Sequence, residues 1–353
     1  MEIDAAVLDA MMAELEQAPR LWRPSAFWER LSRIHAERIA KVGLLNFKRS
    51  INLKYFNWRI SAILAHQLWP VAAELVRGNF SPFLHAEFPG YAPQPEVWTK
   101  GFNSFSAYIY KVFVAMFADY VSRRDVLRLL EVVEEPELGN PFSIIYRGRR
   151  ISQDLLNSIL EFYSATEDID PRGKIGSAAE IGAGYGRLAY AFMKALPRAT
   201  YCIVDIPPAL FVSQTYLSQI FPGERIFRFR PFGSFGEVRQ EFESSRIRFL
   251  MAHQIELLPP KYFDLILNVS SLHEMTRDQI ANYIRSVERL GRRHFYTKQW
   301  KRSHARDNNF ITEHEYPIPA GWQMVHHRTH PVQRPFFEAL YRARAVRETD
   351  KSV

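Results

Sequence analysis

The stretch AAEIGAGYGRLAYAF, residues 178–192, is the most informative part of this 353-residue chain about its fold. A short apolar run leads into three glycines at alternate positions, Gly182, Gly184 and Gly186, and a helical pattern follows them. Glycine tolerates positive φ and lets a backbone approach a ligand closely. The N–H groups at the start of a helix attract anionic and nucleotide-like ligands. The stretch therefore predicts a strand that turns into a helix at a nucleotide-like ligand.

Strands and helices alternate through the rest of the C-terminal half. The predicted strands are 178–181, 199–205, 247–254, 263–271 and 293–300, and the predicted helices are 187–196, 206–220 and 276–290. Residues 321–344 are expected to close the sheet as a hairpin, although 335–344 alone fits a helix equally well. Such alternation predicts an α/β fold, a Rossmann-like parallel sheet with helices on both faces. Sheets of this kind bind ligands at the carboxyl ends of their strands.

Helical periodicity dominates the N-terminal half. Apolar residues recur at helical spacing over 105–120, and residues 52–76 form another helical pattern that is interrupted at Pro70. Ser152 is placed to cap a helix over 151–164. The polar stretch that follows, with proline and glycine, indicates a linker. The sequence therefore predicts a mainly helical domain over 1–168 and a ligand-binding domain over 169–353.

Composition limits the class of protein. Hydrophobic residues make up 47% of the chain, enough for sizeable cores, and the single cysteine, Cys202, excludes an intrachain disulfide. The N-terminal residues are acidic where a signal peptide is basic, and no apolar run approaches the roughly 20 residues of a membrane span. We therefore expect a cytoplasmic protein. The net charge is +8, and Arg285–Val353 contributes +7 of it, with 14 Lys and Arg against 7 Asp and Glu.

Two cofactor classes fit the glycine stretch. Gly184, Gly186 and Ala189 match the dinucleotide fingerprint, and Asp205 lies about twenty residues further on, as NAD binding requires. S-adenosylmethionine instead favours an acidic residue just before three alternating glycines, and Glu180 supplies it. Asp205 would then accept hydrogen bonds from both ribose hydroxyls.

The third predicted strand favours S-adenosylmethionine. HQIELLPPKYFDLIL, residues 253–267, follows a common methyltransferase pattern in which Gln254 replaces the usual aspartate. The Gln254 side-chain oxygen is expected to accept from the adenine amino group, and the Ile255 N–H to reach a ring nitrogen. These groups have no purpose in a dehydrogenase.

Beyond these motifs, the chain resembles the bacterial sugar O-methyltransferase family. The resemblance is carried by NFKRSINLKYFNW, ISQDLLNSILEFY, AEIGAGYGRLAY, DIPPALFVSQTYLS, SLHEM and FFEALY, which are spread through most of the chain. It implies a class I methyltransferase domain over 169–353 and methyl transfer to a hydroxyl of a sugar or glycoconjugate, with or without a linked phosphate. A homodimer is compatible with it, and neither nucleic acid nor a transmembrane segment is expected.

Methyl transfer requires an aligned hydroxyl and a base for its proton. The loop after the fourth strand carries His273, the candidate base, and Glu274, which would orient the imidazole or bind a substrate hydroxyl. His304 is the alternative base. The candidate substrate-binding residues are Gln153, Asp154 and Lys298. Some sugar methyltransferases use magnesium, but no required metal is predicted here, because no clustered carboxylate pair lies on a strand-end loop and residue 277 is arginine where a zinc protease motif requires histidine.

Two other functions stay open at this point. The basic C-terminal segment favours a methyltransferase that acts on nucleic acid, although no familiar nucleic-acid module accompanies it. A non-catalytic binding protein would be expected to show a broken cofactor motif, whereas the glycines and both acids are intact.

Overall fold

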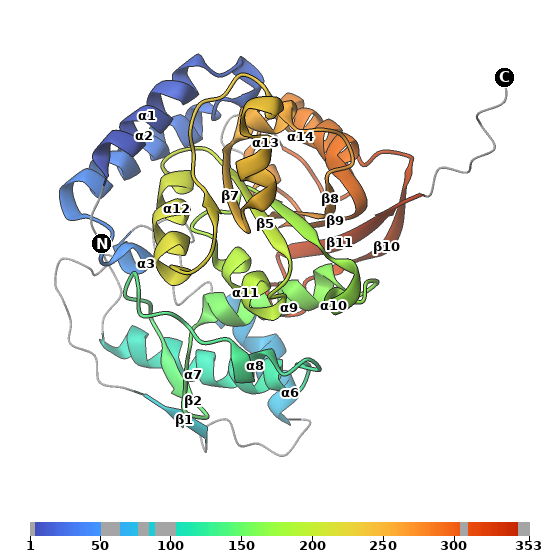
Figure 1. Cartoon of the computed structure of the whole chain (residues 1–353). Helices are drawn as coiled ribbons and strands as arrows, with labels where there is room; N and C mark the ends of the chain where they lie inside the picture. The colour runs from blue at the N-terminus through green and yellow to red at the C-terminus, as the bar shows by residue number, and fades with distance from the viewer. Residues whose placement is uncertain (1–3, 51–63, 77–84, 89–103, 304–309, 345–353) are drawn as a thin grey trace.

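The fold is built around one eight-stranded sheet (Figure 1). The structure is a computed structural model that describes residues 4–50, 64–76, 85–88, 104–303 and 310–344. The strand order is β10-β11-β9-β8-β4-β5-β7-β6. The strands are β4 (Ser177–Ile181), β5 (Thr200–Asp205), β6 (Ile226–Phe227), β7 (Ile247–Met251), β8 (Phe263–Val269), β9 (Gly291–Trp300), β10 (Trp322–Thr329) and β11 (Phe336–Ala343).

The direction of the strands identifies the fold. The six strands from β9 to β6 are parallel, whereas β11 is antiparallel to both β9 and β10. The order reverses at β4, so β5 and β8 lie on either side of the first strand, as in doubly wound sheets. The last hairpin inserts its second strand, β11, between β9 and β10. This is the Rossmann-like sheet of class I methyltransferases, and the predicted fold class is confirmed.

Helices cover both faces because strand residues alternate between two cores. On β5, Tyr201 and Ile203 enter one buried cluster, and Cys202 and Val204 enter the other. The first face carries α9 (Gln153–Ala165), α11 (Arg187–Ala195) and α12 (Ala209–Ile220). The second carries α13 (Phe235–Ser244) and α14 (Arg277–Leu290). The expected cap of α14 is present, since Thr276 and Gln279 bond each other's backbone N–H groups.

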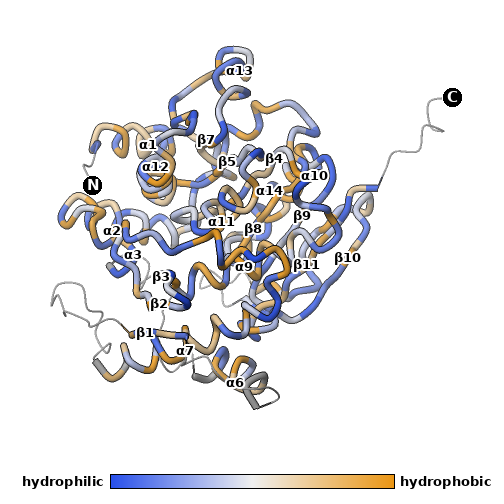
Figure 2. Tube along the Cα trace, turned by 60° about the horizontal axis from the view of Figure 1, so that its bottom comes forward, coloured by the Kyte–Doolittle hydropathy of each residue, from blue (hydrophilic) through white to orange (hydrophobic). Residues whose placement is uncertain are grey.

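The N-terminal half is helical where it is described, with one small sheet. Its elements are α1 (Ala5–Gln17), η1 (Arg20–Trp22), α2 (Ala26–Val42), α3 (Phe47–Ser50), η2 (Leu64–Leu68), α6 (Trp69–Val76), α7 (Ser104–Ser122), α8 (Leu129–Val132), β1 (Ala86–Glu87), β2 (Ile144–Tyr146) and β3 (Arg149–Ile151). Leu8, Phe113 and Leu155 share a buried cluster with Leu210 of α12. Apolar segments of both halves therefore meet in the interior (Figure 2). Among the described helices, none is long and apolar enough to span a membrane.

Several local predictions are corrected. Of the two alternatives for 335–344, the helix is wrong and the expected hairpin is present: β11 pairs with both β9 and β10, and the side chains from Phe337 to Tyr341 are all buried. The predicted strand 247–254 ends at Met251 and continues as a 3₁₀ helix, η5 (Ala252–Leu257). The linker contains a helical turn, α10 (Pro171–Lys174), capped by Asp170. The helix predicted over 52–76 lies partly outside the described residues.

Candidate functional site

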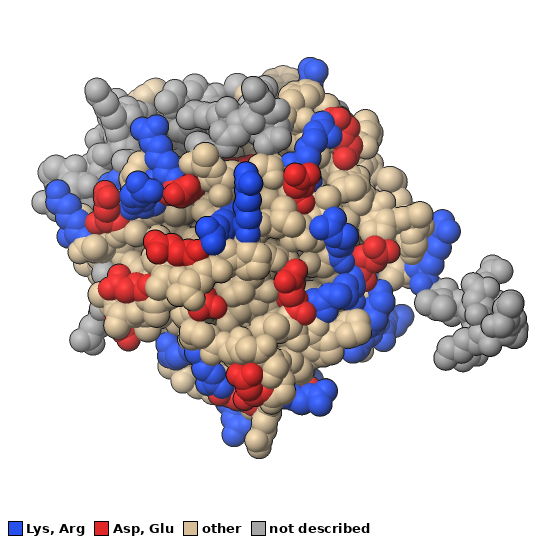
Figure 3. Space-filling view, turned by 90° about the horizontal axis from the view of Figure 1, so that it is seen from above, with Lys and Arg blue, Asp and Glu red and all other residues tan. Residues whose placement is uncertain are grey.

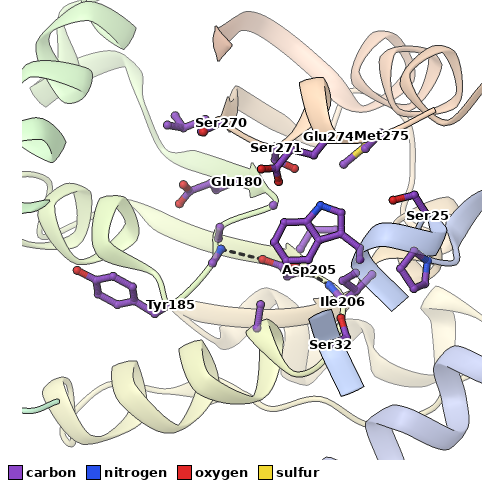
Figure 4. A pocket seen from close by; sticks show the side chains of 18 of the residues that line it. Ser25, Ser32, Glu180, Tyr185, Asp205, Ile206, Ser270, Ser271, Glu274 and Met275 are labelled. Atoms are coloured by element: carbon purple, nitrogen blue, oxygen red, sulfur yellow. Dashed lines mark hydrogen bonds between the residues drawn. The ribbon is translucent and has the colours of Figure 1, made fainter. Parts of the chain in front are cut away.

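A cavity of about 750 Å³ lies at the carboxyl ends of β4, β5 and β8 (Figure 4). Its volume is in the range of small-molecule and cofactor sites. One side, here called the sheet wall, consists of Glu180, Gly182, Gly184 and Asp205. The facing side, the helical wall, comes from η1, α2 and the residues between them: Trp22, Arg23, Ser25, Trp28 and Ser32. The loop after β8 and residues of the β9 and β11 ends complete the lining.

The three glycines of the motif have different structural roles. All three adopt positive φ, between 59° and 85°. A Cβ on Gly182 would lie 2.1 Å from Ser271 Oγ, so this glycine lets the loop after β8 approach. A Cβ on Gly184 would meet nothing within 4 Å, and Gly184 lines the cavity, so a side chain there would project toward a ligand. A Cβ on Gly186 would lie 2.8 Å from Leu217 of α12, so Gly186 serves helix packing and does not line the cavity.

Asp205 ends β5 and joins the glycine loop to the cavity. One carboxylate oxygen accepts from Gly184 N at 2.8 Å, drawn in Figure 4, and the other accepts from Ile206 N at 2.7 Å. Each oxygen keeps further acceptor capacity. Burial raises the pKa of Asp205 to about 7, although the two backbone donors act in the opposite direction. The carboxylate is thus held in a fixed orientation at the edge of the cavity.

Glu180 is the second acid of the sheet wall. Its side chain accepts from the Tyr201 hydroxyl at 2.8 Å. Burial raises the pKa of Glu180 to about 8, although the Tyr201 hydroxyl and the charge of Arg187 act in the opposite direction. A cationic group in the cavity would stabilise its ionised form.

Gln254 and Ile255 do not line the cavity. The Gln254 oxygen accepts from Met251 N, and its amide nitrogen donates to the Arg230 carbonyl. The Gln254 side chain is buried and stabilises the turn into η5. The adenine contacts expected of these two residues therefore stay a prediction without support from the cavity lining.

The loop after β8 gives its two candidate catalytic residues different environments. Glu274 lines the cavity, and its side chain keeps 32% of its surface exposed there. Burial within the protein raises the pKa of Glu274 to about 8, while a hydrogen bond from the Trp28 indole acts to lower it. His273 is buried, does not line the cavity, and bonds Gln299 Oε1 through Nδ1 at 3.0 Å.

The environment of His273 makes it a weak base. Burial lowers the pKa of its imidazole to about 4. Since Gln299 Oε1 can only accept, the Nδ1 atom carries the proton and Nε2 is the unprotonated nitrogen. The Nε2 atom lies 3.8 Å from Glu274 Oε1. The structure therefore brings the two residues together but turns only Glu274 toward the cavity.

The other predicted residues lie on a neighbouring part of the interior. Lys298 Nζ donates to Glu161 Oε1 at 2.8 Å and to Gln333, and Asp154 accepts from the Tyr185 hydroxyl at 2.9 Å. Gln153 is buried and donates to Gln67, which lines the cavity. Asp154 and Lys298 line a small side pocket rather than the main cavity. His304 lies outside the described residues.

Sequence reasoning missed the aromatic lining. Trp22 and Trp28 come from the helical wall, and Trp300 and Phe336 from the ends of β9 and the start of β11. Trp22 packs edge-on against Tyr283 of α14, with ring centroids 5.0 Å apart. No local motif marks these residues, although the segment 20–28 has an unusual density of tryptophan.

The described residues show no metal site, and two arginines of the C-terminal segment are paired with acids. No group of three or more His, Cys, Asp or Glu side chains there is arranged to hold a metal ion. Basic residues of the C-terminal segment are paired: Arg328 with Glu167 and Glu338, and Arg342 with Asp168. Figure 3 shows one face of the molecule on which basic and acidic side chains are interspersed.

Fold and cavity together define the class of protein, a chain with the fold of class I, S-adenosylmethionine-dependent methyltransferases. The sheet wall fits that cofactor, because Gly184 leaves space for a ligand, Asp205 offers acceptors for hydroxyls and Glu180 an acceptor for an ammonium group.

Comparison with known proteins gives weak likenesses in structure only. No protein-family model and no curated protein sequence matches the chain. It is similar to mitomycin 7-O-methyltransferase, with 15% identity, a TM-score of 0.36 and 54% of each chain covered. It is also similar to 1,6-didemethyltoxoflavin-N1-methyltransferase from Burkholderia thailandensis, with 16% identity, a TM-score of 0.38, and 74% of this chain and 94% of that chain covered. The chain spans only about half the length of the mitomycin enzyme. The fold is identified by the strand order of the sheet and not by these likenesses.

Proposed function

We propose that the chain is an S-adenosylmethionine-dependent O-methyltransferase whose acceptor is a hydroxyl of a sugar or glycoconjugate. The observation that carries the proposal is the Asp205 carboxylate, held by Gly184 N and Ile206 N at the edge of a cavity that also contains Glu180. Cofactor and acceptor would share this cavity.

The sheet wall would hold the cofactor. Asp205 would accept from the ribose hydroxyls, and Glu180 would accept from the ammonium of the methionine end. The open space beside Gly184 would let the ligand lie against the backbone. Bound there, the cofactor supplies a methyl group that is already activated by a sulfonium.

The remaining lining suits a polyhydroxylated acceptor. Aromatic faces of Trp28, Trp300 and Phe336 offer apolar contact, while Ser25 and Ser32 offer hydroxyls, a mixture typical of small-molecule sites. The resemblance to sugar O-methyltransferases in sequence motifs points to the same class of acceptor. The region 1–168 would act as the acceptor-binding cap, because its η1 and α2 form the helical wall.

Glu274 is the base that this geometry favours. The Glu274 carboxylate, which lines the cavity, would take the proton of the acceptor hydroxyl as its oxygen bonds the methyl carbon and the bond from that carbon to sulfur breaks. Trp28 would orient that carboxylate through its indole N–H. His273 is buried behind the loop with a lowered pKa and would not be the base, and its unprotonated Nε2, 3.8 Å from Glu274 Oε1, has no proton to donate to that carboxylate.

Two alternatives, an NAD-binding oxidoreductase and a methyltransferase that acts on nucleic acid, have less support. The antiparallel insertion of β11 distinguishes this sheet from the dinucleotide-binding order of six strands. The pairing of tail arginines with Glu167, Asp168 and Glu338 leaves less unbalanced charge for a phosphate backbone.

Calorimetry with S-adenosylhomocysteine and NAD, together with release of S-adenosylhomocysteine in the presence of a panel of methyl glycosides, tests the proposal. We expect S-adenosylhomocysteine to bind, NAD not to bind, and at least one glycoside to be methylated. If NAD binds and S-adenosylhomocysteine does not, the proposed cofactor is wrong. Turnover of RNA but of no glycoside would overturn the acceptor.

A further inference from the structure

A small side pocket adjoins the main cavity and has no role in the proposed reaction. Its volume is about 30 Å³. Arg187, Val269, Ser270, Gln333 and Phe336 line both spaces, so a ligand in the cavity can reach the pocket with one substituent. A space of this size holds one or two non-hydrogen atoms.

The pocket presents an unsatisfied acceptor. Asn157 of α9 lines it and is only 3% exposed, and its Oδ1 has no hydrogen-bond partner among the described residues. A buried carbonyl oxygen without a donor is costly, so such groups normally bind a donor. An occupant that donates a hydrogen bond would satisfy this oxygen.

The charges around the pocket favour a neutral occupant. Glu161 bonds both nearby cations but balances only one of their charges: it accepts two bonds from Arg187 and one from Lys298 Nζ, and the Asp154 carboxyl also lines the pocket. Two of the three Lys298 N–H groups are used, by Glu161 and Gln333, which leaves one to donate. A hydroxyl both donates and accepts, whereas an ammonium cannot accept and would be repelled by Lys298 and Arg187.

We infer that the side pocket is a specificity site for one hydroxyl of the acceptor. This hydroxyl donates to Asn157 Oδ1 and accepts from Lys298 Nζ, and it is not the hydroxyl that is methylated. The inference rests on the proposed function and adds a requirement to it: an acceptor must carry a second hydroxyl at a fixed distance from the reacting one. A site built to bond a hydroxyl strongly rejects an analogue without it.

Asn157→Leu removes the acceptor atom at nearly constant volume, and Asn157→Asp retains an oxygen there. Asn282→Leu, a buried asparagine of α14 outside both spaces, is the matched control for the loss of a buried amide. One probe is S-adenosylhomocysteine, used in calorimetry. The other is a glycoside that the enzyme methylates, compared with its series of monodeoxy analogues in kcat/KM measurements.

We expect wild type to discriminate against one monodeoxy analogue, and Asn157→Leu to lose roughly 10- to 100-fold in kcat/KM on the parent glycoside but not on that analogue. The affinity for S-adenosylhomocysteine should stay within about twofold, and Asn282→Leu should behave as wild type. Equal discrimination in wild type and Asn157→Leu would overturn the inference. A large loss of S-adenosylhomocysteine affinity would also overturn it, because a cofactor group would then occupy the pocket.

A crystal structure of the S-adenosylhomocysteine complex tests the side pocket even if no glycoside is methylated, a result that would contradict the proposed sugar acceptor. Ordered water within hydrogen-bond distance of both Asn157 Oδ1 and Lys298 Nζ would support a hydroxyl site. An atom of the cofactor in that place would overturn it, as would a protein donor on Asn157.

Discussion

The two walls of the cavity are built in opposite ways. The sheet wall comes from two short segments, and its contacts depend on backbone geometry: positive φ at Gly184 and the backbone N–H groups that hold Asp205. The helical wall depends on side chains such as Trp28, brought from 150 or more residues away in the sequence. A wall fixed by the backbone suits an invariant ligand, and a wall of side chains suits a ligand that differs between enzymes. We therefore expect sheet-wall variants to change cofactor affinity and helical-wall variants to change turnover.

The largest effect is expected where the two walls meet, at Glu274. Glu274→Gln removes the proton acceptor but keeps the shape, so kcat should fall by roughly 10²- to 10⁴-fold, as for loss of a general base. Steady-state release of S-adenosylhomocysteine measures the change, and calorimetry should show unchanged cofactor affinity. His273→Ala is the comparison variant and should lose less. If His273→Ala loses more than Glu274→Gln, the base is His273.

The next largest effect belongs to the sheet wall. Asp205→Ala should weaken S-adenosylhomocysteine binding by roughly 100-fold or more, since two hydrogen bonds to a charged group are lost. Wild-type affinity should also rise with pH between about 6 and 8, because burial raises the Asp205 pKa to about 7 and ionisation improves the acceptor. Asp205→Asn should remove that pH dependence. Calorimetry at several pH values measures both, and an unchanged affinity in Asp205→Ala would contradict the assignment.

The same contrast explains how much the sequence predicted. Alternating strands and helices, the glycine turn and the α14 cap are local patterns, and all appear in the structure. The different environments of His273 and Glu274 are not local, because they depend on Gln299 and Trp28, which reach the loop from other elements. Gln254 matches a motif, but its side-chain amide is already hydrogen-bonded within the protein: its oxygen accepts from Met251 N, and its nitrogen donates to the Arg230 carbonyl.

A matched pair of glycine variants separates ligand contact from folding within the sheet wall. Gly184→Ala places a methyl group in open space, so S-adenosylhomocysteine affinity should fall about tenfold or more, with only the modest strain of a positive φ. Gly182→Ala places its methyl group against Ser271 Oγ at 2.1 Å, so its Tm should fall further than that of Gly184→Ala. Calorimetry and thermal melting give the two readouts. If the two variants lose the same Tm and bind S-adenosylhomocysteine equally well, the distinction between a ligand-contact glycine and a packing glycine is wrong.

A smaller effect tests the helical wall. The base must be ionised, so the rate should rise with pH through the Glu274 pKa of about 8, rather than through the His273 pKa of about 4. Trp28→Phe removes a donor to the carboxylate, which should raise that pKa and move the acid limb to higher pH. Trp22→Phe is the control: it keeps an aromatic ring in the same wall, where Trp22 packs against Tyr283, and it should leave the limb in place. An acid limb near pH 4 in the pH–rate profile would instead indicate that His273 is the base.

The smallest effect concerns the stability of the ligand-free sheet wall. Glu180 holds its proton to about pH 8 in the folded chain because burial disfavours the carboxylate, whereas an unfolded glutamate titrates near 4.5. Between those values the unfolded chain releases a proton that the folded chain retains, so wild-type stability should decline as pH rises from about 4.5 to about 8.

Glu180→Gln cannot titrate, so its Tm should decline less over that window. Glu274 and Asp205 are present in both proteins, and the difference between the two curves therefore isolates Glu180. Thermal melting at pH 5, 6.5 and 8 without cofactor measures it, and parallel curves would contradict the raised pKa. If Glu180→Gln is also the weaker binder of S-adenosylhomocysteine, the wild-type carboxylate lowers the stability of the empty protein at high pH and favours the cofactor ammonium when it binds. That combination would separate a cofactor-binding acid from one that only packs against Tyr201.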